Sequence, residues 1–232
     1  MGFSPSKNAH LQVPGPAFST TPTCDSLPSS KIDARSAMTP SITTVSGPEL
    51  QQWLEPVAAL RIRVFRDFPY LYEGTLDYEK DYLRRYQDST RSVLVLALAG
   101  SEVVGASTGL PMDDADPAFQ QPFRAAGYAI DSIYYFGESV LLPEYRGHGI
   151  GHRFFDEREA CARRHGFAFT TFCAVQRPAD HPARPEGYVP HDAFWTKRGY
   201  QERPDLTCDY HWRDIGDSEE TLKPMRFWIR SC

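Results

Sequence analysis

Hydrophobic and polar residues recur with different periods along this 232-residue chain, and these periods predict its elements. Apolar residues three or four positions apart predict helices. Five segments have this spacing: 46–68, 75–86, 116–127, 149–165 and 191–199. Ser46 is a candidate N-cap of the first helix, and Pro56 is expected to interrupt it.

Short apolar runs that end at turn residues predict strands. These runs are 41–45, 91–99, 102–107, 130–143, 167–175, 209–214 and 225–230. Gly100 and Ser101 form the turn of a predicted hairpin, and Gly137 marks a predicted bulge. Helices and strands alternate throughout residues 41–232, which indicates a mixed α/β fold (α+β) in one domain.

Residues 1–40 are rich in Ser, Thr and Pro and show no periodicity. Such a segment buries too little apolar surface to offset its ordering entropy, so we expect a disordered tail. Its composition resembles a transit peptide, so an organelle address remains an alternative. Arg35 is its only arginine, which argues against that alternative. No apolar run reaches the roughly 18 residues of a membrane helix. We therefore expect a cytoplasmic protein without a membrane partner.

The net charge of −5 argues against nucleic acid as a partner, because nucleic-acid-binding proteins neutralise phosphates with a basic face. An acidic balance fits a cationic small substrate better. The five cysteines show no CxxC spacing, which favours reduced thiols. His181 and His191 have no Cys, Asp or Glu at ligand spacing, so no metal is expected.

The stretch RGHGIG, residues 146–151, separates an apolar run from a predicted helix. A helix start carries free amide groups and the positive end of the helix dipole, and glycines leave room for a phosphate there. The alternative is a turn that uses glycine for its geometry alone. A dinucleotide fingerprint would need glycine at 152 or 154, where His and Phe stand, and there is no P-loop sequence.

Residues 140–151 resemble motif A of the GNAT superfamily of N-acetyltransferases, whose core is [QR]xxGx[GA], and residues 193–200 (AFWTKRGY) resemble its motif B. The resemblance covers residues 42–230 and implies a mostly antiparallel mixed sheet, splayed at an acetyl-CoA site and flanked by helices. It implies that the pyrophosphate rests on Arg146, Gly147, His148, Gly149, Ile150 and Gly151. It also implies that pantetheine binds backbone groups at Val140, Leu141 and Leu142. Arg153 either approaches a phosphate oxygen or remains a solvated cation.

Attack of an amine on a thioester needs a neutral amine, a donor for the oxyanion and a proton for the thiolate. The resemblance implies that the Leu141 backbone NH is the oxyanion donor. Glu138 is a candidate base, with an ordinary cross-strand or solvent-facing role as the alternative. The family often places a tyrosine that acts as general acid where this chain has Trp195. Tyr188, Tyr200, water or unaided departure of the thiolate therefore remain open.

Acceptor recognition has two candidate segments. Residues 66–86 place five acids among aromatic residues, a pattern that suits a cationic amine or an ordinary solvated face; the acids are Asp67, Glu73, Asp77, Glu79 and Asp81. Residues 176–190 contain four prolines and are expected to border the acceptor pocket. We therefore expect an acetyl-CoA-dependent N-acetyltransferase for a small-molecule or peptide amine, with a noncatalytic acyl-CoA sensor as the alternative. Whether it forms a homodimer is open.

Overall fold

The computed structural model describes residues 39–232, so the tail expected at 1–40 falls almost entirely outside the described residues. Seven strands form one sheet in the order β1-β2-β3-β4-β5-β7-β6. Their bounds are β1 Ser41–Val45, β2 Val93–Ala99, β3 Glu102–Pro111, β4 Ile133–Leu141, β5 Phe169–Val175, β6 Gln201–Trp212 and β7 Thr221–Ser231. These strands pair antiparallel except β4 and β5, which are parallel. The predicted mixed, mostly antiparallel fold is confirmed.

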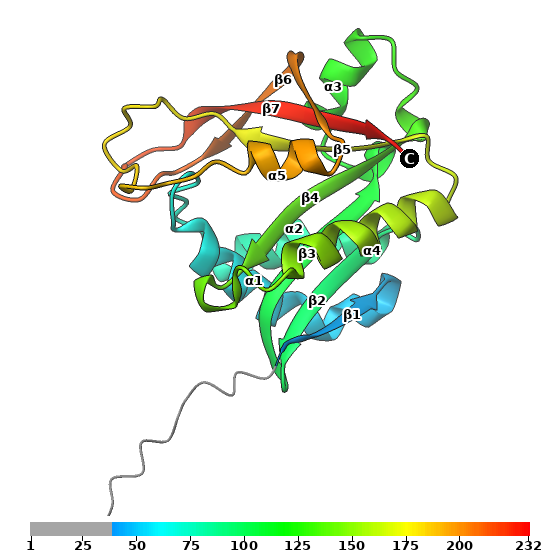
Figure 1. Ribbon diagram of the computed structural model, residues 1–232, viewed down its shortest axis with the longest axis horizontal. Helices are drawn as coiled ribbons and strands as arrows, with labels where there is room; N and C mark the ends of the chain where they lie inside the picture. Colours follow the sequence, from blue (N-terminus) through cyan, green and yellow to red (C-terminus); the bar gives the residue numbers. More distant parts are fainter. Residues whose placement is uncertain (1–38) are drawn as a thin grey trace, which may run out of the picture. The chain divides into compact units, whose positions relative to one another are not determined.

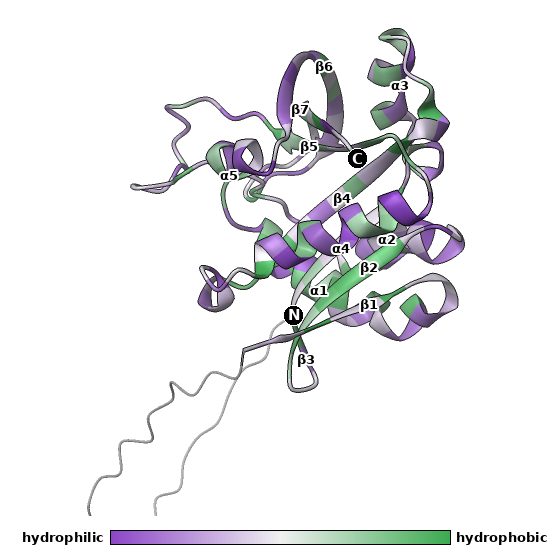
Figure 2. Ribbon diagram, turned by 45° about the vertical axis from the view of Figure 1, so that its right-hand side comes forward, coloured by the Kyte–Doolittle hydropathy of each residue, from purple (hydrophilic) through white to green (hydrophobic). Residues whose placement is uncertain are grey.

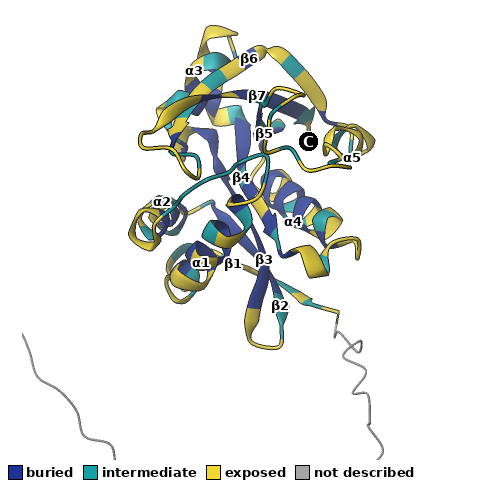
Figure 3. Ribbon diagram, turned by 90° about the vertical axis from the view of Figure 1, so that its left-hand side faces the viewer, coloured by how far each residue is buried: buried dark blue, intermediate teal, exposed yellow. Residues whose placement is uncertain are grey.

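The helices cover both faces of this sheet. Their bounds are α1 Leu54–Phe65, α2 Leu76–Asp88, α3 Pro117–Ala125, α4 Ile150–Arg164 and α5 Asp192–Lys197. Figure 3 shows α1 and α2 on one side of β3 and β4, with α4 on the other. In the described part of the chain, no helix combines the length and apolarity needed to cross a bilayer.

The first predicted helix differs from the observed one at its start. Residues Gly47–Trp53 form a 3-10 helix, and Ser46 precedes it without a side-chain capping bond. Pro56 lies in the first turn of α1, where a backbone NH has no partner within the helix and proline is tolerated. The prediction that Pro56 interrupts the helix is therefore wrong, because the change of helix type comes before it.

The last two strands extend well beyond the predicted segments 209–214 and 225–230. β6 starts at Gln201, and its register against β7 shifts between Arg203 and Thr207. β6 is an edge strand with most of its residues exposed or half-buried. Its first half lacks an apolar run for this reason, so the hydrophobic pattern gave no signal there.

β2 and β3 are interior strands of the sheet. Residues 93–97 of β2 and 103–111 of β3 are all buried, since helices cover both faces. Figure 2 shows β2 as a continuously apolar strand. A strand buried on both faces has this continuous pattern instead of alternation. The hairpin predicted around Gly100 and Ser101 is confirmed.

β4 and β5 separate along most of their length. They pair only from Ile133–Phe169 to Tyr135–Thr171, and β4 then runs away from β5 (Figure 1). On its other side β4 carries a bulge, since the pair Ser107–Ser139 is followed by Gly109–Phe136. The bulged residues are Gly137 and Glu138, as the sequence predicted for Gly137.

A buried arginine holds this bulge. Arg158 of α4 is 1% exposed and donates to the backbone oxygens of Glu138 (3.0 Å) and Thr108 (3.3 Å) and to Ser139 Oγ (2.8 Å). Desolvation lowers the pKa of Arg158 to about 10, so the guanidinium stays charged at neutral pH. Arg158 thus supplies donors to carbonyl groups where the strand ladder is interrupted.

Gly137→Ala is expected to destabilise the protein by about 1–3 kcal/mol. An added Cβ would lie 1.9 Å from Tyr86 Oη and 2.7 Å from Thr108 Oγ1. Urea unfolding measures the change, and Tyr86→Phe in the same chain should restore part of the loss. Gly151→Ala is the control, because its Cβ would meet only Phe194 at 3.7 Å. Equal stability of both variants would contradict this account of the bulge.

Candidate acyl-CoA site

A cavity of about 1200 Å³ opens where β4 and β5 diverge. Its wall combines the start of α4, the free edge of β4, the residues of β5 beyond Thr171, the 176–191 loop and α5. This volume exceeds the roughly 300–1,000 Å³ of ordinary small-molecule pockets. The cavity therefore has room for an extended ligand.

The turn before α4 is shaped to bind an anion. Gly147 and Gly149 have φ of 81° and 78°, a left-handed conformation that favours glycine, and a Cβ at either position would project into open space. Among residues 39–232, the amides of residues 147–151 have no backbone acceptor. Together with the helix dipole, these amides can bind a diphosphate.

The structure places the predicted phosphate-binding residues in two groups. Arg146, Gly147, Gly149, Ile150 and Gly151 line the large cavity. His148 is exposed, and its Nδ1 lies 3.3 Å from the Tyr145 backbone oxygen. Arg153 is also exposed and pairs with Glu157 at 3.9 Å, away from the cavity wall.

The three predicted pantetheine positions on β4 differ in what their backbone faces. Leu142 donates to the Val104 oxygen at 3.0 Å, and Val140 pairs with Ala106 of β3. Leu141 occupies the non-hydrogen-bonded position opposite Gly105, so its NH faces away from β3 into the gap beside β5. Leu141 is therefore the position of the three whose NH is available to a ligand in the cavity, while its oxygen accepts from Arg146 Nε at 3.2 Å.

The candidate proton donors occupy different environments. Tyr188 lines the large cavity and packs edge-on against Phe68. Partial burial raises the pKa of its hydroxyl, which therefore stays protonated at neutral pH. Tyr200 is 2% exposed and bonds to Thr170 and Glu159, outside the cavity wall. Trp195 lines the cavity and packs against Phe172 and Trp228.

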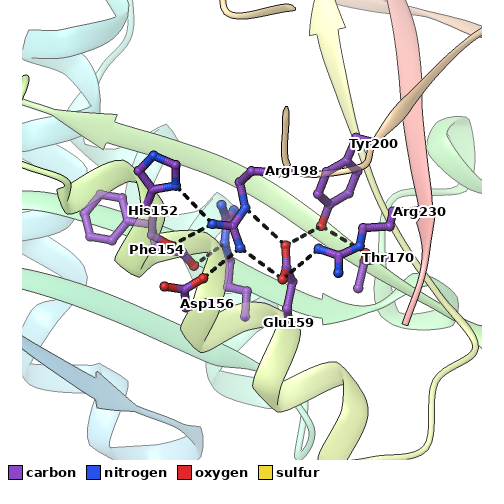
Figure 4. A network of polar contacts seen from close by, with 9 residues as sticks. His152, Phe154, Asp156, Glu159, Thr170, Arg198, Tyr200 and Arg230 are labelled. Carbon is purple, nitrogen blue, oxygen red and sulfur yellow. Dashed lines mark hydrogen bonds and ion pairs between the residues drawn. The ribbon is translucent and has the colours of Figure 1, made fainter. Parts of the chain in front are cut away.

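An ion-pair network joins the two sides of the cavity (Figure 4). Glu159 of α4 accepts from Arg198 Nη2 at 3.0 Å, from Arg230 Nη1 at 3.0 Å and from Tyr200 at 3.2 Å. Arg198 also bonds to Asp156 at 2.7 Å. The network fixes the end of α5 and strand β7 against α4, so the cavity has a defined width.

A second arginine fixes the foot of the 176–191 loop. Arg177 donates to the backbone oxygens of Pro69 (2.8 Å) and Tyr70 (2.9 Å) and makes a bidentate pair with Asp214, both bonds at 2.8 Å. Its guanidinium thus joins the α1–α2 connection to the β6–β7 hairpin. No local sequence pattern indicates this role of Arg177.

Of the five acids in residues 66–86, Glu79 alone is buried. It lines a smaller cavity together with Glu138, and Arg61 of α1 pairs with both carboxylates. Glu138 is 8% exposed, so it does not have the solvent-facing role considered as an alternative. Arg61 was missed from the sequence, although a charge on the apolar stripe formed by Val57 and Phe65 was a usable signal.

The chain matches the acetyltransferase (GNAT) family over residues 57–186, more than half of its length. This chain belongs to the GNAT acetyltransferase family. Membership supports acyl transfer as its general chemistry, and the cavity and the glycine turn fit the acyl-CoA that the family typically uses. Across the described residues, no three His, Cys, Asp or Glu side chains are grouped to hold a metal.

Solved structures show the same fold. A ribosomal-protein-alanine N-acetyltransferase from Brucella melitensis is 15% identical with a TM-score of 0.55, covering 83% of this GNAT chain and 99% of that one. An acetyltransferase of the GNAT family from Staphylococcus aureus Mu50 is 12% identical with a TM-score of 0.53, covering 82% and 99%. These identities establish the fold alone. No curated protein matched the chain.

Glu159→Gln is expected to lower the free energy of unfolding by about 3 kcal/mol, because it leaves the largely buried Arg198 and the half-buried Arg230 without their shared carboxylate. Chemical denaturation measures the loss. Asp156→Asn is the matched control, since it removes an exposed partner of the same Arg198 and should cost below about 1 kcal/mol. A loss of equal size in both variants would show that Glu159 does not hold the network together.

Proposed function

We propose that this protein is an acetyl-CoA-dependent N-acetyltransferase that acetylates an amine of a small molecule or peptide by direct attack in a ternary complex. The observation that carries the proposal is the turn at residues 146–151, whose glycines and free amides face the gap beside β4. Family membership supports the same chemistry.

The cosubstrate binds mainly to the backbone in this proposal. The amides of residues 147–151 hold the pyrophosphate, assisted by the guanidinium of Arg146, and the free edge of β4 at Ser139 and Leu141 lines the space for the chain that carries the thioester. Acetyl-CoA supplies an activated acyl group on a thiol that leaves more readily than an alcohol, since a thiol pKa is about 8.5.

The residues around the gap then serve the transfer. The neutral amine nitrogen forms a bond to the carbonyl carbon, the carbon–sulfur bond breaks, and the amine loses a proton to solvent or a base. The Leu141 NH donates to the developing oxyanion from a fixed position on β4. Tyr188, protonated at neutral pH, donates to the departing thiolate. Glu138, the candidate base on β4, lines the adjoining smaller cavity.

Gly149→Ala is expected to raise the Kd for coenzyme A at least about tenfold, equivalent to about 1.4 kcal/mol. Its methyl group would occupy the open space in front of the amides, and its φ of 78° disfavours alanine. Isothermal titration calorimetry measures the change. Gly166→Ala is the matched control, because Gly166 follows the other end of α4 with φ of 75° and equally open space. Equal affinities in both variants would contradict the binding turn.

Tyr188→Phe is expected to lower kcat at least about tenfold while the KM for acetyl-CoA changes little, because it removes the donor and keeps the contact with Phe68. Thiol release in the presence of an amine measures kcat. Tyr200→Phe is the control, since its hydroxyl belongs to the Glu159 network. An unchanged kcat for Tyr188→Phe would indicate that the thiolate leaves unaided. Coenzyme A binding without thiol release for any amine would support a noncatalytic sensor instead.

A further inference from the structure

A second cavity, of about 90 Å³, lies on the α1–α2 side of the sheet. Its wall is mostly aromatic and includes Tyr70, Tyr72, Tyr78, Tyr82, Tyr135 and Trp212. Phe65 and Tyr70 line both this cavity and the large one, so the two adjoin at these side chains. Burial raises the pKa of the Tyr70 and Tyr82 hydroxyls, so these walls stay uncharged at neutral pH.

Arg61, Glu79 and Glu138 line this small cavity together with His211, and with the histidine counted as neutral their charges sum to −1. Arg61 pairs with Glu79 through Nε and with Glu138 Oε2 through Nη1 at 2.5 Å. Its guanidinium lies 4.3 Å from the centre of the Tyr82 ring and 5.0 Å from that of Phe65. One built-in cation therefore faces two carboxylates, which leaves the cavity one positive charge short of neutrality.

Two carboxylate oxygens remain available in this cavity. Glu79 Oε1 and Glu138 Oε1 are buried, and within residues 39–232 neither has a hydrogen-bond partner. Arg61 Nη1 is likewise buried and has its ion pair with Glu138 Oε2 but no hydrogen bond in the same part of the chain. Burial, and after it the neighbouring Glu79 carboxylate within hydrogen-bonding reach, raise the pKa of the Tyr72 hydroxyl. The side chains of Glu79 and Glu138 are 1% and 3% exposed. Buried carboxylate oxygens without donors are costly, so a ligand with N–H groups would satisfy them.

We propose that the small cavity binds an alkylammonium group of the acceptor. Aromatic faces and unpartnered carboxylate oxygens are the groups that recognise an organic cation. An anion is disfavoured, because Arg61 is already paired with both acids. The volume of about 90 Å³ suits the end of a short alkyl chain rather than a whole peptide.

The bound ammonium is an anchor rather than the nucleophile. A site that stabilises the charged form raises the pKa of the bound amine and holds it protonated, whereas attack requires the neutral form. The reacting amine is therefore a second nitrogen of the same molecule, which lies in the large cavity. This inference rests on the proposed acetyltransferase function and narrows its acceptors to molecules with an alkylammonium group besides the amine that is acetylated.

Three series of acceptor compounds, assayed with the full-length wild-type chain, test whether the small cavity binds an alkylammonium group. We would compare α,ω-diamines of two to six methylene groups with amino alcohols of the same length, which replace the anchoring ammonium by a neutral hydroxyl, and with the matching amino acids, which replace it by a carboxylate. Thiol release gives kcat/KM for each compound. The best diamine is expected to exceed its amino alcohol at least about tenfold, the scale of a hydrogen bond to a charged group. Equal values at every length, or a preference for the amino acids, would overturn the proposal.

Variants locate the preference within the cavity. Glu79→Gln should reduce the ratio of diamine to amino alcohol toward one while the Kd for coenzyme A stays unchanged. Asp77→Asn is the matched control, because Asp77 is an exposed acid in the same turn of α2 and lies outside both cavity walls. A diamine preference that persists in Glu79→Gln would exclude Glu79 as the anchor.

A binding measurement covers the case in which Glu79→Gln folds poorly. In wild-type protein without acetyl-CoA, n-propylammonium should show saturable binding by ligand-observed NMR, whereas n-propanol and propionate should not. Equal binding of the alcohol or the acid would overturn the proposal. Absence of coenzyme A binding, or of thiol release with every acceptor, would instead contradict the acetyltransferase function itself.

Discussion

The separation of β4 from β5 is the constraint on which the rest of this structure depends. Two parallel strands that part after Tyr135 and Thr171 leave backbone groups unpaired in the middle of a sheet, and such groups need other partners. Arg158 supplies donors on the β3 side, where the Gly137–Glu138 bulge interrupts the ladder. On the β5 side the Leu141 NH remains free for a ligand. Arg158 thus satisfies carbonyl oxygens at the bulge, whereas the Leu141 NH has no partner in β3.

Under the proposed function, the two cavities give the two substrates separate approaches. The large cavity lies along the start of α4, and the small cavity lies under α1 and α2 on the opposite face of the sheet. Alternation along β4 assigns its residues to the two sides, since Ser139 and Leu141 line the large cavity while Glu138 lines the small one. Phe65 and Tyr70 form the border. A donor and an acceptor bound in this way would meet without crossing each other's path.

The sequence predicted features that depend on local patterns. The β2–β3 hairpin, the glycine turn and the bulge at Gly137 each follow from residues close together in the chain. Prediction from the sequence failed where contacts between distant segments determine the structure. Arg61 pairs with Glu138, 77 positions away, through contacts that no local period encodes. The first half of β6 is an exposed edge held by β7, so its residues carry no apolar pattern. The acidic stretch at 66–86 identified the right region, but burial alone distinguished Glu79 from its neighbours.

The bidentate pair between Arg177 and Asp214 separates the 176–191 loop into a fixed base and a replaceable tip. Because the base is tied to Pro69, Tyr70 and the β6–β7 hairpin, residues beyond it can change in length or sequence without disturbing the sheet. Under the proposed function, the part of the acceptor in the large cavity can therefore vary by loop exchange, while the glycine turn before α4 stays unchanged.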